Sequence, residues 1–170
     1  SHLGGHNLDP NDVTAFVLHS GPGTSLVPPV FGENNSGTFS FQPGMVYGQT
    51  YYISLVAGNN LLGLPDPADP CFSVAQGQPV VFYQNPVAQA GVDLDTCGLV
   101  LLLNANTGVG AGHWSVVAAP LPDTLAITSV QNANTAVTAS GYGTFLLSWT
   151  LDNNGCADTD TVALDFNGTP

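Results

Sequence analysis

The sequence predicts an all-β chain made of two tandem immunoglobulin-like β-sandwich domains. Short runs rich in β-branched, aromatic and aliphatic residues alternate with clusters of turn residues, and 20 Gly and 13 Pro occur among the 170 residues. Strands spaced in this way between turns are typical of β-sandwiches. No apolar pattern of helical period continues for more than about two turns, so we expect helix to be a minor component.

Nine segments have the length and composition of strands. Each is rich in Val, Ile, Thr, Leu, Phe, Tyr or Trp and is bounded by residues that favour turns. Pro interrupts most of the stretches that could otherwise form a helix. In chain order the segments are Val13–Leu18, Gly37–Phe41, Thr50–Ala57, Val80–Tyr83, Leu99–Leu103, Trp114–Val117, Leu125–Thr128, Thr144–Thr150 and Thr161–Phe166.

An internal repeat divides the chain into two units of similar architecture. The stretch from Tyr47 to Asn60 can be laid over the stretch from Tyr142 to Asn154 with a single one-residue gap. Both contain Tyr-Gly, then Thr, three large apolar residues, Ser and a loop that opens with Asn-Asn, which indicates a repeated structural unit. The sequence therefore predicts one sandwich over residues 1–86, which lacks its first strand, and a second over 87–170.

Three aromatic residues of the repeat have predicted structural roles. Tyr47 and Tyr142 each stand at the entry to the apolar strand, where immunoglobulin-like sandwiches place a tyrosine whose buried hydroxyl bonds to backbone. Packing beside a Gly turn is the alternative. Trp149, inside the repeated strand, and Trp114 are expected in the core, with an aromatic platform for sugars as the alternative.

The spacing of the three cysteines predicts one disulfide bond. Cys97 begins an apolar strand and Cys156 follows the repeated strand, 59 residues later. A Cys97–Cys156 bridge would stabilise the second sandwich by about 4 kcal/mol through lost chain entropy, and such bridges are typical of extracellular proteins. Cys71 has the corresponding place in the first unit without a partner, so it is either a free thiol or bonded to another chain.

The charge of the chain excludes several classes of function. No Lys or Arg occurs among the 170 residues, and 12 acidic residues give a formal net charge of −12. Nucleic acids and anionic membrane surfaces would repel such a chain. No apolar run approaches the roughly 20 residues that cross a bilayer, so no membrane insertion is expected. Trypsin would find no cleavage site, which suits a protein exposed outside the cell.

Carboxylates are the remaining chemical resource, and 11 of the 12 acidic residues are Asp. Asp is a common Ca²⁺ ligand in loops, and Asp152, Asp158 and Asp160 form the candidate site. Turn geometry alone also explains Asp in loops, which is the alternative. No Gly-x-Ser-x-Gly motif and no Cys or His pair with zinc spacing occurs. We therefore expect no enzymatic activity and no cofactor other than Ca²⁺.

Structural motifs recur along both halves of the chain. The first half contains Thr38-Phe39-Ser40-Phe41 and Asp69-Pro70-Cys71, and the second contains Gly141-Tyr142-Gly143-Thr144-Phe145 and Asn154-Gly155-Cys156. These motifs are similar to those of immunoglobulin-like and PKD-like modules repeated in very large secreted surface proteins of Bacteroidetes, of the adhesin and gliding-motility type. The resemblance implies export to the cell surface, tandem β-sandwiches and an adhesive or filamentous role.

Together these observations predict a non-enzymatic extracellular protein, a repeat or subunit of a cell-surface filament or adhesin stalk. Its predicted partner is the chain itself, as a homopolymer or as tandem repeats of a longer chain, assembled through sandwich contacts or strand complementation. The alternative is an accessory module that binds glycans through exposed aromatic residues and Ca²⁺.

Overall fold

The computed structural model describes residues 10–168, and this part of the chain contains thirteen strands and no helix. The all-β fold predicted from the sequence is therefore confirmed. Among these residues no helix could span a membrane. The chain divides into two compact units, residues 1–82 and 83–170, whereas the sequence places the boundary at 86. The predicted lack of an opening strand concerns the start of the chain, and residues 1–9 lie outside the described residues.

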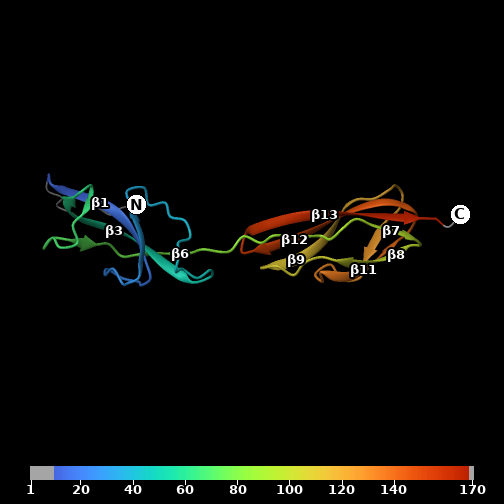
Figure 1. Cartoon of the computed structure of the whole chain (residues 1–170), viewed down its shortest axis with the longest axis horizontal. Helices are drawn as coiled ribbons and strands as arrows, with labels where there is room; N and C mark the ends of the chain where they lie inside the picture. Colours follow the sequence, from blue (N-terminus) through green and yellow to red (C-terminus); the bar gives the residue numbers. More distant parts are fainter. Residues whose placement is uncertain (1–9, 169–170) are drawn as a thin grey trace. The chain divides into compact units, whose positions relative to one another are not determined.

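Unit 1 is built on one sheet with β3 (Thr50–Leu61) at its centre (Figure 1). β3 pairs antiparallel with β1 on one side and with three short strands on the other. β2 adds the outer edge beyond β1. The remaining strands are β1 (Asp12–His19), β2 (Val30–Asn34), β4 (Leu64–Pro65), β5 (Ser73–Val74) and β6 (Gln78–Val81).

Both faces of this sheet are covered by apolar side chains. Successive residues of a strand point to opposite faces, so Val17 packs with one cluster and Leu18 with the other. Phe39 and Phe41 pack against the second cluster, although the predicted strand Gly37–Phe41 does not form. That segment supplies aromatic rings to the core without pairing its backbone to the sheet.

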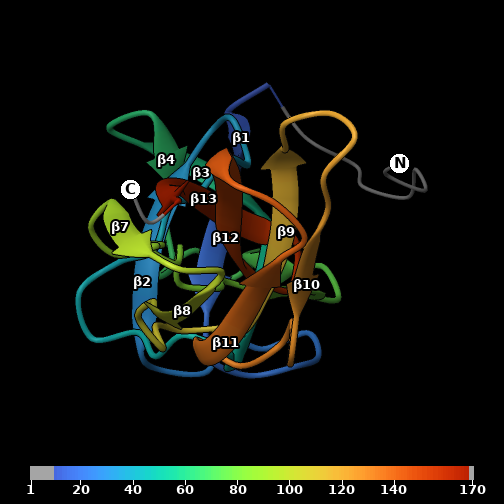
Figure 2. The ribbon, with the colours of Figure 1, turned by 90° about the vertical axis from the view of Figure 1, so that its right-hand side faces the viewer.

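Unit 2 is an immunoglobulin-like sandwich of two sheets, whose strands can be followed in Figure 2. One sheet has the order β10-β11-β8 and the other the order β7-β13-β12-β9. β7 runs parallel to β13, which brings the first strand of the unit beside its last. The strands are β7 (Leu94–Cys97), β8 (Val100–Asn104), β9 (Ala111–Ala118), β10 (Leu125–Ile127), β11 (Asn134–Ala139), β12 (Gly143–Asn153) and β13 (Cys156–Asn167).

The two strands of the internal repeat, β3 and β12, hold equivalent places in the two units. Each lies inside its sheet with neighbours on both sides. Tyr51 in β3 and Phe145 in β12 stand at the same place in the repeat, and both are buried. An interior strand can keep a long apolar run out of water on both edges, which explains why the apolar part of the repeat occupies this position.

Candidate functional site

Two carboxylates of β13 hold a segment that precedes the first strand of unit 2. Asp158 and Asp160 are two residues apart, so both side chains leave the same face of β13. The Asp158 carboxylate accepts a hydrogen bond from the Ala88 N–H at 2.8 Å, and the Asp160 carboxylate accepts one from the Ala90 N–H at 2.9 Å. The donors are also two residues apart, so the two carboxylates take the place that backbone carbonyls take in a sheet.

Asn106 holds the other side of the same segment. Its side-chain oxygen accepts from the Gln89 N–H, and its backbone N–H donates to the Gln89 carbonyl, both at 3.0 Å. Its side-chain NH₂ donates to the Val87 carbonyl at 2.7 Å. Because Ala88 and Ala90 are buried, their amides need such partners. Residues 87–90 are thus fixed on both sides without belonging to a regular strand.

Other acidic side chains also bind backbone amides. Asp93 accepts from the Ala163 N–H at 2.8 Å, and Asp152 accepts from the Gly155 N–H at 2.9 Å in the turn between β12 and β13. In unit 1, Asp69 accepts from the N–H groups of Cys71 and Asn59. The bond from Cys71 and then that from Asn59 lower the pKa of Asp69, while burial acts in the opposite direction. These carboxylates therefore accept hydrogen bonds from the protein's own backbone.

The predicted Ca²⁺ ligands do not share one site. Asp152 caps a turn, whereas Asp158 and Asp160 face the segment at residues 87–90. Within residues 10–168, no group of three or more His, Cys, Asp or Glu side chains could hold a metal ion. The geometry therefore gives these three aspartates a role in holding backbone, which the sequence alone did not distinguish from a cation site.

The predicted Cys97–Cys156 disulfide is wrong, because all three cysteines are free thiols. Cys156 is the first residue of β13, and Cys97 is paired with Asn167, the last residue of the same strand. At about 3.3 Å per residue, the two cysteines lie roughly 35 Å apart, whereas a disulfide joins Cα atoms about 4.4–6.8 Å apart. The third cysteine, Cys71, is exposed.

We expect reduction to leave the stability of unit 2 unchanged, since no bridge constrains it. A colorimetric thiol titration of the monomeric chain, denatured without a reducing agent, should detect all three cysteines. The urea midpoint should be the same with and without reductant. A monomer that titrates one thiol, and whose midpoint falls on reduction, would restore the disulfide.

The buried hydroxyl predicted for Tyr47 and Tyr142 belongs instead to Tyr51. Tyr47 and Tyr142 are 44% and 53% exposed, whereas Tyr51 is 2% exposed. The Tyr51 hydroxyl oxygen accepts a hydrogen bond from the Val46 N–H at 2.6 Å, five residues upstream. A tyrosine tied to preceding backbone is thus present at the entry of β3, but it is the residue that points into the core and not the one that precedes the strand.

Trp114 and Trp149 lie together in the core of unit 2. Each is 2% exposed, and their ring centroids are 5.1 Å apart. The Trp149 indole N–H donates to the Asn106 carbonyl at 3.0 Å, and that of Trp114 donates to the Asn132 carbonyl at 3.2 Å. Both polar atoms therefore have partners, and neither ring presents a face to solvent as a sugar platform would.

A histidine and a serine form a buried pair in unit 1. His19 in β1 and Ser54 in β3 are both fully buried, and His19 Nε2 lies 2.9 Å from Ser54 Oγ. His19 Nδ1 has no hydrogen-bond partner within the described part of the chain. Burial lowers the pKa of His19, so the neutral imidazole is favoured. The pair is closed to solvent, which suits a packing role better than nucleophilic chemistry.

We expect unit 1 to lose stability as the pH falls below about 6.5, the ordinary pKa of histidine. The pKa of His19 is lower in the folded chain, so below pH 6.5 the unfolded chain binds more protons and is favoured. The stabilising contribution is complete above that pH and decreases as the pH falls through the folded pKa. Histidine NMR titration between pH 7.5 and 5 should show the His19 pKa below the ordinary histidine value of about 6.5, and a His19 pKa above that value would contradict the prediction.

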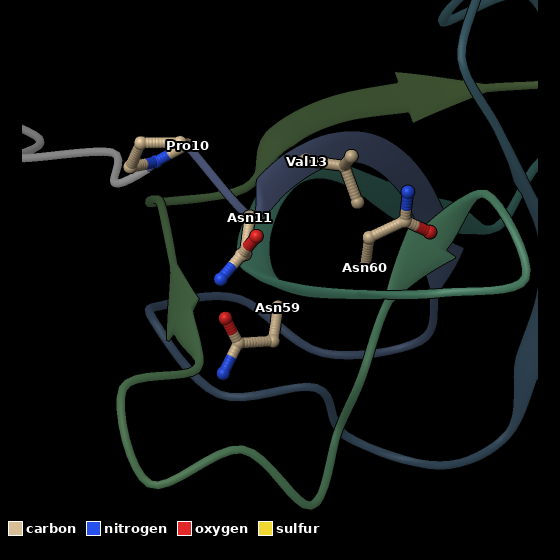
Figure 3. A pocket seen from close by; sticks show the side chains of 5 residues that line it. All are labelled: Pro10, Asn11, Val13, Asn59 and Asn60. Atoms are coloured by element: carbon tan, nitrogen blue, oxygen red, sulfur yellow. The ribbon is translucent and has the colours of Figure 1, made fainter.

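An open hollow in unit 1 is lined, among the described residues, by Pro10, Asn11, Val13, Asn59 and Asn60, none of which is titratable (Figure 3). A smaller groove at one end of unit 2 is lined mainly by glycines and amides, including Gly108, Gly110 and Asn132. A Cβ at Gly110 would overlap the Asp152 carbonyl. Close packing of backbone therefore explains that glycine, and the described residues that line the two hollows include no Asp, Glu, His or Cys.

No family model and no curated protein matches the chain, and the resemblance to Bacteroidetes modules stays a prediction. Among solved structures, the chain is similar to human protocadherin-24 EC1-2, with 12% identity, a TM-score of 0.35, and coverage of 94% of this chain and 84% of that one. It is also similar to the zebrafish RET cadherin-like domains 1 to 4, with 10% identity, a TM-score of 0.27, and coverage of 95% and 42%. Both scores are low, so the fold described above stands on the strands of this chain itself.

Proposed function

We propose that this chain is a non-enzymatic extracellular structural protein, a repeat or subunit of a cell-surface filament or adhesin stalk. Two compact β units follow one another along the chain, which is the organisation of proteins built from tandem modules. The complete absence of Lys and Arg removes every site for trypsin-like proteases. Such a chain is suited to long exposure outside the cell.

The observation that carries the proposal is what the acidic side chains do. Asp93, Asp152, Asp158 and Asp160 bind backbone amides of their own unit. The one buried histidine of the described chain pairs with a buried serine. These four carboxylates and this histidine are thus engaged in maintaining the two β units. This use of reactive groups favours a structural role over a catalytic one.

Immunogold electron microscopy of the source cells, with antibodies raised against the purified chain, tests this proposal. The label should follow extracellular filaments or stalks at the cell surface. Label confined to the cytoplasm, or to material released from the cells without any filament, would overturn it. Preimmune serum and cells lacking the chain are the matched controls.

A glycan-binding module is the second candidate, and one pair of rings favours it. Tyr47 is 44% exposed and its ring is stacked on Phe41, with centroids 3.8 Å apart and an angle of 9° between planes. This stacking holds an aromatic face in a fixed orientation at the surface, as sugar platforms require. Ca²⁺ would assist such a module only through carboxylates other than those that hold backbone.

A glycan array with the whole chain separates the two candidates. Binding that is lost in Tyr47→Ala, kept in Tyr142→Ala and sensitive to EDTA would favour the binding module with Ca²⁺. Tyr142 is the matched control because it is exposed to a similar degree in the other unit. A chain that binds no glycan with or without Ca²⁺ would eliminate this candidate.

A further inference from the structure

The outer face of the three-stranded sheet in unit 2 is apolar and exposed. Val100 and Leu102 of β8 are 58% and 72% exposed. They lie beside Thr138 and Ala136 of β11, and Ala126 of β10 continues the same row across the sheet. No acidic residue occurs in β8, β10 or β11. This face therefore carries no charge in a chain whose net charge is −12.

β8 is also an edge strand that no other strand covers. It pairs only with β11 among the described strands. The Leu99 carbonyl accepts from the Ala139 N–H of β11, and the Ala105 N–H donates to the carbonyl of Ala133, just before β11. The alternation of an antiparallel ladder therefore turns the N–H and C=O of Val100 and Leu102 toward the open edge. Further along, Gln89 accepts from the Asn106 N–H and ends the open stretch.

The other edges of unit 2 differ from β8. β7 contains Asp95 and follows Asp93, and β10 follows Asp123. On β9, the Trp114 N–H donates to the Val130 carbonyl at 2.7 Å, so a loop covers part of that edge. Charges and covering loops are the usual means by which proteins prevent edge pairing. β8 contains no acidic residue, and the covering segment at residues 87–91 borders its edge only from Asn104 onward, so the edge at Val100 and Leu102 has neither protection.

The charge distribution favours a second copy of the chain as the occupant of this edge. The acidic residues of unit 2 are Asp93, Asp95, Asp123, Asp152, Asp158, Asp160 and Asp165, and six of these seven lie on or next to the four-stranded sheet. A cationic partner would be attracted to that sheet. Two copies of an anionic chain repel each other there, and they approach without like-charge contact at the uncharged three-stranded sheet.

We propose that β8 is a self-association edge, at which two copies of this chain pair antiparallel about a two-fold axis at Leu101. In this register Val100 of one copy lies opposite Leu102 of the other. The open backbone groups of these residues then form about four hydrogen bonds, and their apolar side chains meet on one outer face. A two-fold contact closes on itself, so it joins filaments or stalks side by side. The inference deepens the proposed function and rests on it.

Sedimentation velocity of the whole chain over a wide range of concentrations tests the edge. We expect a dimer that dissociates on dilution. Leu102→Asp should raise its dissociation constant by at least about tenfold, because each new carboxylate replaces an apolar contact with Val100 of the other copy and the two carboxylates lie diagonally across the two-fold axis. Leu102→Pro should do the same. Its N–H faces the open edge, so proline removes an intermolecular donor without removing a bond of the monomer's own ladder.

Leu121→Asp is the matched control, because Leu121 is 95% exposed and lies outside β8. It should leave the dimer intact, and circular dichroism should show that all three variants remain folded. A wild-type monomer at every concentration would overturn the inference, as would a dimer that survives both Leu102 variants. Immunogold labelling decides the proposed function independently. If the chain is monomeric but labelled in surface filaments, the β8 contact is wrong and the proposed function stands. If it dimerises through β8 but is labelled only inside cells, the filament role is wrong and the β8 contact stands.

Discussion

Trp149→Ala is expected to destabilise unit 2 by about 3–5 kcal/mol, the cost of removing a large aromatic side chain from a core. Its ring is buried against Trp114, and its indole N–H satisfies the Asn106 carbonyl. Gly112 shows how closely the ring packs, because a Cβ at that position would overlap it. The substitution would leave both a cavity and a carbonyl without its donor. Since Asn106 also holds residues 87–90, the damage should extend to that segment.

Urea unfolding followed by tryptophan fluorescence measures this effect in unit 2 alone, because both tryptophans of the chain lie there. In Trp149→Ala the remaining Trp114 reports the transition. Val117→Ala, at an exposed position of β9, is the control and should shift the midpoint little. A loss below about 1 kcal/mol for Trp149→Ala would mean that the ring is not packed as described.

The double variant Asp158→Ala with Asp160→Ala is expected to destabilise unit 2 by about 2–6 kcal/mol. Each substitution removes the acceptor of one amide, at Ala88 or Ala90, and each buried donor left unpaired costs about 1–3 kcal/mol. The direction of this effect is informative. Removing two negative charges from a chain of net charge −12 would by itself reduce repulsion and favour folding, so destabilisation isolates the role of the hydrogen bonds.

Asp95→Ala is the control for charge, because Asp95 lies exposed on the neighbouring strand β7. It should be neutral or slightly stabilising. The same unfolding curves in EDTA and in CaCl₂ separate the two interpretations of these carboxylates, because a bound ion would raise the stability of the wild-type chain in proportion to its occupancy. Equal midpoints in both solutions support direct binding of amides. A midpoint that rises with Ca²⁺ in the wild type but not in the double variant would support a cation site.

The long central strands were predictable because their sequence pattern is local. β3 and β12 each have three consecutive large apolar residues and further apolar residues after a serine, and the same residues suit an interior strand. β11 (Asn134–Ala139) was missed because it consists mainly of small and polar residues, and its pairing with β8 and β10 decides its conformation. The strand predicted over Gly37–Phe41 is wrong for the opposite reason. Its phenylalanines suggested a strand, but packing of their rings on a sheet does not require backbone pairing.

The candidate site was less predictable because it depends on contacts between distant segments. Ala88 and Asp158 are 70 residues apart, and nothing in either local sequence indicates that they meet. The error on Cys97 and Cys156 has the same origin. Their separation along the chain allowed a bridge, but the parallel pairing of β7 with β13 puts them at opposite ends of one strand. Which tyrosine is buried, Tyr51 or Tyr47, depends on which residue of the turn begins the strand. The sequence pattern does not fix that residue.

Amide hydrogen exchange at Ala88 and Ala90, measured by NMR in EDTA, tests most directly the claim that the acidic side chains of unit 2 hold its backbone. Neither residue belongs to a regular strand, so exchange would be fast without the two aspartates. We predict slow exchange at both amides in the wild-type chain, unchanged by added CaCl₂, and fast exchange at Ala90 alone in Asp160→Ala. Fast exchange in EDTA that becomes slow only when Ca²⁺ is added would contradict the account.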